Sequence, residues 1–146
     1  MDKRNAEIIK SLNELLQGEY MALESFNNFI SKVESEKLKQ IFKDVQKHHR
    51  DNISVLADYI QDLGGQPDEN LGFKGKMAEI WLNMKLDYKD SNEVLEKAIE
   101  GETQGINAAE KILRGTLDEE ARSMTELILD NDRQSINKLK SLLTYV

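Results

Sequence analysis

Apolar residues recur three or four positions apart along four long stretches of the chain, which is the spacing of one face of an α-helix. These stretches extend over residues 8–33, 38–63, 95–113 and 117–142. The first contains the stripe Ile8, Leu12, Leu15, Ala22, Phe26, Ile30 and Val33. The pattern predicts four amphipathic helices that bury their apolar faces against one another in an all-α bundle.

Each apolar stripe is interrupted near its middle by one polar residue. The interrupting residues are Glu19, His49, Glu102 and, in the fourth stripe, Asp132 or Asn131. Because they lie on the apolar faces, we expect these side chains to point into the bundle, where a titratable group needs a partner.

The chain also repeats itself weakly and without gaps. A Gly-Glu pair recurs 83 residues apart, at Glu19 and at Glu102, and the same offset places His49 on Asp132. A repeat of this kind indicates that one helical hairpin occurs twice. It singles out the same four polar positions that interrupt the stripes.

Breaks in the pattern mark the expected helix ends. Ser35 is placed to cap the second helix, and the Gly-Gly-Gln-Pro segment at 64–67 ends it. The third helix opens at Ser91, and Thr116 with Glu119 forms a capping box for the fourth.

A further amphipathic stretch, residues 71–89, separates the second helix from the third. As a helix it would extend about 25 Å, enough to return the chain along most of the bundle. The third helix then runs parallel to the second, and the topology is two antiparallel hairpins joined by a long crossover. Since Glu19 and His49 are both 15 residues from Glu34 at the first turn, we expect them to lie at one height. By the same reasoning around the turn near Gly115, Glu102 lies within one helical turn of Asp132, so we expect all four residues to cluster near the middle of the bundle.

Composition narrows the class of protein. A chain of 146 residues fits a single domain, 1–146, and the absence of cysteine excludes disulfides and thiolate ligands. No apolar run approaches a membrane span, so we expect no membrane partner and a cytoplasmic location. The net charge of −7 argues against a nucleic-acid surface.

The chain resembles the ferritin-like four-helix bundles, whose two related hairpins carry a glutamate on the first and third helices and Glu-x-x-His on the second and fourth. Within that superfamily, the two Gly-Glu pairs, the segment 63–67 and the Trp81-bearing crossover resemble a bacterial family catalogued as a domain of unknown function. The resemblance covers nearly the whole chain and implies a ferritin-like fold.

The resemblance also implies a ligand set, which this sequence only partly provides. Glu19 and Glu102 match the carboxylates of the first and third helices, and His49 matches the histidine of the second. Gln46 stands where a glutamate is expected, and the fourth helix offers Asp132 but no histidine. A two-iron centre lacks half of its ligands, whereas a single Fe, Zn or Mn ion keeps a suitable set of nitrogen and oxygen donors, with Gln46 as an additional candidate.

A metal-free interpretation accounts for the same residues. Glu19 can hydrogen-bond to His49, and Arg50 or Arg133 can fold inward to balance Glu102. His48 is expected on the surface.

Small residues form a ridge on the third helix: Ala98, Gly101, Gly105 and Ala108. We expect another helix to pack closely against this ridge, with a ligand groove as the alternative.

The leading functional interpretation is a non-catalytic cytoplasmic bundle with a polar or vestigial metal site, either stress-related or a self-associating interaction module. No phosphate loop, nucleophile elbow or His-Glu-x-x-His motif is present. The alternative is a protein that binds one Fe, Zn or Mn ion in an oxidative or iron-handling role. A homo-oligomer is compatible with both, and the sequence identifies no protein partner.

Overall fold

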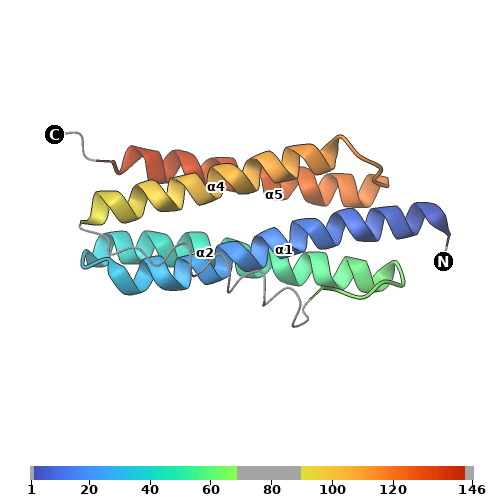
Figure 1. Ribbon diagram of the computed structural model, residues 1–146, viewed down its shortest axis with the longest axis horizontal. Coiled ribbons are helices and arrows are strands. Elements are labelled where there is room, and N and C mark those ends of the chain that lie inside the picture. The colour runs from blue at the N-terminus through green and yellow to red at the C-terminus, as the bar shows by residue number, and fades with distance from the viewer. Residues whose placement is uncertain (1, 69–89, 144–146) are drawn as a thin grey trace.

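The protein folds into long helices that lie side by side (Figure 1). The structure, a computed structural model, describes residues 2–68 and 90–143. Within these residues there are four helices and no strand: α1 Lys3–Lys32, α2 Glu36–Asp62, α4 Ser91–Leu113 and α5 Glu119–Ser141. The helix and crossover expected at 71–89 lie outside the described residues.

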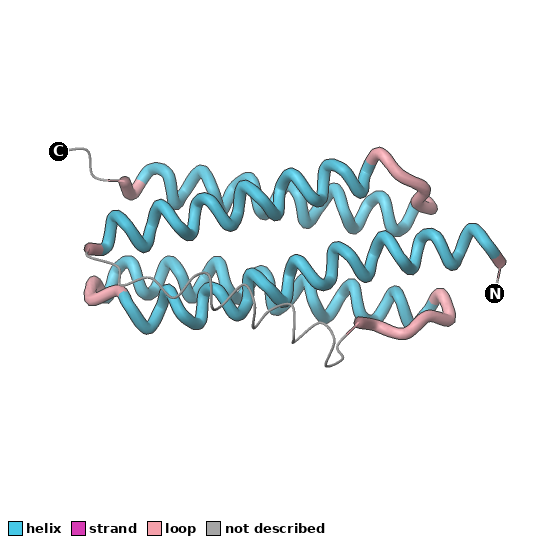
Figure 2. Tube along the Cα trace, viewed as in Figure 1, coloured by secondary structure: helices cyan, strands magenta, loops and turns pink. Residues whose placement is uncertain are grey.

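The helices form two antiparallel hairpins, α1 with α2 and α4 with α5 (Figure 2). The hairpins pack through α1 against α4 and α2 against α5. In Figure 1, α2 and α4 both run from left to right, whereas α1 and α5 run from right to left. The prediction that the third helix of the bundle runs parallel to the second is therefore confirmed.

Side-chain caps define where the helices begin. Ser35 accepts a hydrogen bond from the backbone N–H of Leu38, as predicted. The prediction of a capping box at Thr116 is wrong, because Asp118 is the N-cap of α5 and accepts from the N–H of Ala121. Asp118 lies directly before the first helical residue, so its short carboxylate reaches the free N–H groups that Thr116 cannot reach.

The turn after α2 depends on glycine. Gly64 has φ of 85°, a left-handed conformation that side chains other than glycine rarely adopt. At Gly65 a Cβ atom would lie 2.8 Å from two carbon atoms of the Ile9 side chain, so this glycine permits the turn to approach α1 closely. The helix end predicted from the segment 64–67 is confirmed.

The apolar interior consists of two clusters. One includes Leu12, Leu16 and Leu56, and the other includes Phe26 and Phe42. The predicted stripes are largely confirmed. In α1, however, Phe29 is buried whereas Ile30 is half-buried. These neighbours differ by about 100° around the helix, and a spacing of three or four residues does not decide between them.

The small-residue ridge of α4 is not covered by a helix among the described residues, so this expectation is wrong there. Gly101 and Ala108 are exposed. A Cβ atom at Gly101 or Gly105 would meet no atom within 4 Å. Only Ala98 of the ridge lies in the core.

Candidate metal centre

One polar side chain from each of the four described helices reaches the middle of the bundle. Glu19, Glu102 and Asp132 are each 4% exposed, and His49 is 3% exposed. The helical spacing explains why they point inward, since each occupies a position that continues an apolar stripe. The predicted convergence of Glu19, His49, Glu102 and Asp132 is confirmed.

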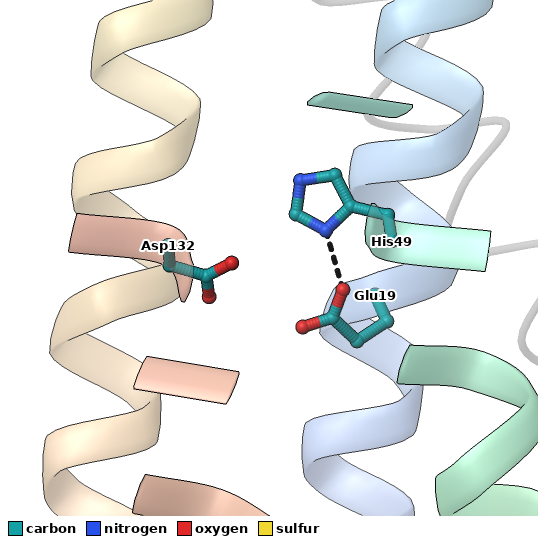
Figure 3. A group of neighbouring side chains, drawn as sticks. All are labelled: Glu19, His49 and Asp132. Carbon is teal, nitrogen blue, oxygen red and sulfur yellow. Dashed lines mark hydrogen bonds and ion pairs between the residues drawn. The ribbon is translucent and has the colours of Figure 1, made fainter. Parts of the chain in front are cut away.

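His49 is the centre of the hydrogen-bond network. Its Nδ1 atom contacts Oε2 of Glu19, and its Nε2 atom lies 2.6 Å from Oε1 of Glu102. Figure 3 shows the first of these contacts, with Asp132 facing the pair from α5. Because a carboxylate oxygen can only accept, each ring nitrogen must donate, and the ring is therefore an imidazolium.

Local electrostatics favour that charged ring. Burial lowers the pKa of His49, but the nearby carboxylates of Glu102 and Glu19 more than offset it, so the pKa lies well above its ordinary value of 6.5. The ring of Phe26 lies next to the imidazolium, with 5.9 Å between the ring centroids. At that distance an aromatic face also attracts a cation.

The pKa of Asp132 is also raised, but for a carboxyl group a raised pKa favours the neutral form. Burial first, and then the negative charges of Glu19 and Glu102, raise the pKa of its carboxyl group from 3.8 to about 8, while His49 lowers it. At neutral pH the network therefore favours a protonated Asp132 beside two carboxylates and an imidazolium. A further cation bound beside Asp132 would lower its pKa and favour the ionised carboxylate.

Three of these residues could hold such a cation. One ligand atom each from Glu19, His49 and Asp132 lies within 4.8 Å of the other two. The atoms come from three helices, α1, α2 and α5, and all three residues are buried (Figure 3). Carboxylate oxygens with one imidazole nitrogen form a donor set that suits iron, manganese and zinc.

Gln46, one turn before His49 on the inward face of α2, uses its side-chain amide to contact α1. The Gln46 side-chain nitrogen donates to the carbonyl oxygen of Leu23 and to Oδ1 of Asn27, both 2.8 Å away on α1. His48 is exposed, as predicted.

The expectation that an arginine balances Glu102 is wrong. Arg50 is exposed, and the guanidinium of Arg133 lies 3.0 Å from Oε1 of Glu110 at the surface. Both arginines directly follow an inward residue in their helices, His49 and Asp132, and so point about 100° away from the interior. His49, and not an arginine, provides the positive charge beside Glu102.

Two further polar residues line the interior near the centre. Asn52 is 6% exposed and Ser135 is 7% exposed, and each lies one turn beyond its helix's inward residue. The 83-residue offset places one on the other. The helical spacing fits either Asn52 or its neighbour Ile53 at this inward position, and the structure buries Asn52 and half-buries Ile53.

None of the described helices is long and apolar enough to cross a membrane.

Comparison with solved structures identifies the fold. A ferritin-like diiron-carboxylate protein from Bacillus anthracis has a TM-score of 0.76 at 24% identity, over 99% of this chain and 100% of that one. Dps from Thermosynechococcus elongatus has a TM-score of 0.80 at 12% identity, over 95% of this chain and 91% of that one. The dodecameric thioferritin, a bacterioferritin-related protein from Bacteroides fragilis, has a TM-score of 0.74 at 19% identity, over 92% of this chain and 82% of that one. The fold is a ferritin-like helical bundle, as the sequence predicted.

No curated protein matches the sequence significantly. Residues 7–115 match the family described as "Domain of unknown function (DUF2383)". This match covers well over half of the chain and agrees with the family resemblance seen in the sequence. The chain therefore belongs to the DUF2383 family of ferritin-like proteins.

Proposed function

We propose that this protein binds one divalent transition-metal ion, iron, zinc or manganese, at the centre of the bundle. Glu19, His49 and Asp132 are its ligands, and Glu102 provides a further carboxylate beside them. The observation that carries the proposal is the buried group of three ligand atoms from three helices, all within 4.8 Å of one another.

The excess negative charge of the centre favours the binding of a cation. Three carboxyl groups and one imidazole are buried together, and the two arginines considered as counter-charges are at the surface. Even with His49 as an imidazolium and Asp132 protonated, one negative charge remains in excess. Burying an unbalanced charge is unfavourable, so a bound cation would stabilise the fold.

His49 changes its role when it becomes a ligand. Both of its nitrogens donate to carboxylates in the structure, so one must lose its proton before it can bind an ion. Asp132 must likewise give up its proton. The affinity for metal should therefore rise with pH, with protons released on binding. A bound ion would supply Lewis acidity, or redox chemistry if it is iron or manganese.

A two-metal centre does not fit the residues present. At the position where the resemblance expects a glutamate on α2, the Gln46 amide is hydrogen-bonded to α1. The 83-residue offset places Leu129 at the corresponding position of α5, and a leucine cannot bind metal. The fourth helix has Asp132 in place of a histidine. These residues support one ion and no oxygen-activating di-iron chemistry.

A non-catalytic bundle with a metal-free polar network is the second candidate. The observation that favours it is that both nitrogens of His49 already have carboxylate partners. In that case the network fixes the register of the helices and the protein acts through its surface, as a stress-related or interaction module.

Thermal melting across a metal titration separates the two candidates. The measurement compares the wild type with Glu19→Gln, and Glu14→Gln, an exposed change on the same helix, is the control. For a metal ligand, the wild type and the control gain about 2.7 kcal/mol at a hundredfold excess of Fe(II), Zn(II) or Mn(II) over the dissociation constant. Glu19→Gln should lose most of that gain. Melting curves that do not respond to any of the three metals would establish the metal-free network instead.

The cytoplasmic location and the homo-oligomer stay predictions. The dodecameric state of the Bacteroides fragilis neighbour supports testing self-association of this chain by light scattering.

A further inference from the structure

Asn52 is buried with an unused hydrogen-bond donor. Its side-chain Nδ2 has no partner, and it is the one buried side-chain nitrogen or oxygen within residues 2–68 and 90–143 of which this is true. Buried donors in proteins are nearly always paired, with protein, water or ligand. An unpaired amide in the interior therefore points to a partner that is not part of the chain.

The place of Asn52 indicates what that partner contacts. Asn52 follows His49 by three residues on the inward face of α2, and side chains at this spacing have Cβ atoms about 5 to 6 Å apart. On the other side, Leu56 is fully buried in an apolar cluster. Asn52 thus lies at the boundary between the carboxylate–histidine centre and the apolar interior, within reach of a small molecule that touches both.

Other polar groups near the centre are already engaged. The Gln46 amide, one turn before His49, donates to two acceptors on α1. The Thr125 hydroxyl donates to the carbonyl oxygen of Ala121 in its own helix. The free hydrogen-bond donor near the centre is therefore the Asn52 amide.

We propose that Asn52 is the binding residue for a small exogenous ligand of the metal centre, a water, hydroxide or small anion that accepts a hydrogen bond from the Asn52 amide while bound to the cation. This inference rests on the proposed metal site. It adds that an outside ligand of the metal would be held on the side of Asn52, by the donor that has no partner in the chain.

The test uses cobalt(II) as a spectroscopic probe ion and azide as the small anion. The full-length wild type is titrated with cobalt and then with azide, and the visible cobalt absorption reports both events. Asn52→Leu keeps a similar volume but removes the donor. The control is Thr125→Val, which removes a buried hydroxyl about two turns away from Asp132 on α5.

The expected result is a cobalt affinity within about threefold of the wild type in both variants. The azide affinity should fall about tenfold in Asn52→Leu alone, which corresponds to the loss of one hydrogen bond to an anion. Because the change removes an unpaired buried donor, metal-free Asn52→Leu should melt at or above the wild-type temperature. If Asn52→Leu does not fold, Asn52→Ala replaces it in the same titration.

Two results would overturn the inference while leaving the metal site intact: cobalt binding without any azide response in the wild type, or equal azide affinity in the wild type and Asn52→Leu. Failure of the wild type to bind cobalt at all would overturn the metal site and this inference together.

Discussion

Asp132→Asn should change how the stability of the metal-free protein depends on pH. The pKa of Asp132 is raised from 3.8 to about 8 by burial and by Glu19 and Glu102, and it is lowered by His49. Between these two values the folded state holds a proton that the unfolded state has lost. The stabilisation by this proton is complete below pH 3.8 and is lost as the pH rises through 8, so the free energy of unfolding falls with pH.

The magnitude follows from the shift. One group contributes at most about 1.4 kcal/mol per pH unit between its two pKa values. Between about pH 5 and pH 8 the wild type should therefore lose about 3 to 4 kcal/mol that Asp132→Asn, which has no proton to lose, retains. The pKa of His49 is also raised, so its contribution falls in the same direction above pH 6.5, but it is present in both proteins.

Urea unfolding in the presence of a chelator, repeated at each pH unit from about 5 to 8, measures this difference. Asp130→Asn is the control, because Asp130 is an exposed residue of the same helix and its replacement should leave the pH dependence of the wild type unchanged. If the wild type and Asp132→Asn lose stability in parallel over this range, Asp132 does not carry the proton that the folded state holds.

Three further predictions concern the bundle outside the centre. Gly101→Ala should raise the free energy of unfolding by about 0.5 to 1 kcal/mol, because alanine favours the helix and its Cβ meets no atom; urea unfolding that shows a loss would contradict this. Gly65→Ala should instead lower the unfolding free energy in the same assay, because its Cβ would lie 2.8 Å from two Ile9 carbons; an unchanged value would show that Ile9 moves aside freely. Tyr59 donates to Oδ2 of Asp118 at 2.5 Å, and burial and this bond raise its pKa to about 12, so Tyr59→Phe should remove a tyrosine step near pH 12 from the ultraviolet titration.

The inward residues could be predicted from the sequence because the spacing of the apolar residues shows the helical period directly. Glu19 and Glu102 continue an apolar stripe, and the repeat identified them independently. Where two neighbouring residues both fit the spacing, the helical period alone does not indicate which of them is buried. In the structure Asp132 is buried and Asn131 is half-buried. The stripe of the first helix was assigned to Ile30, whereas the structure buries its neighbour Phe29 more deeply.

Side-chain partners were harder to predict, because they depend on distances between helices. Arg50 or Arg133 was expected to balance Glu102, but Arg50 is exposed and the helical position of Arg133 directs it to Glu110 at the surface. The double engagement of His49 by Glu19 and Glu102 requires α1, α2 and α4 to meet at one height. The turn spacing within each hairpin indicated that all four inward residues lie near mid-bundle, but it did not indicate which of them pair between the hairpins.

The most direct test of the metal site is element analysis combined with anomalous scattering from crystals of protein purified without chelator. We expect one transition-metal ion per chain, with a single anomalous peak contacted by Glu19, His49 and Asp132. In protein from the triple variant Glu19→Gln, His49→Gln and Asp132→Asn, the ion should be absent. Two irons per chain with an optical band from an oxo-bridge, or metal-free crystals after incubation with Fe(II), Zn(II) and Mn(II), would contradict the account.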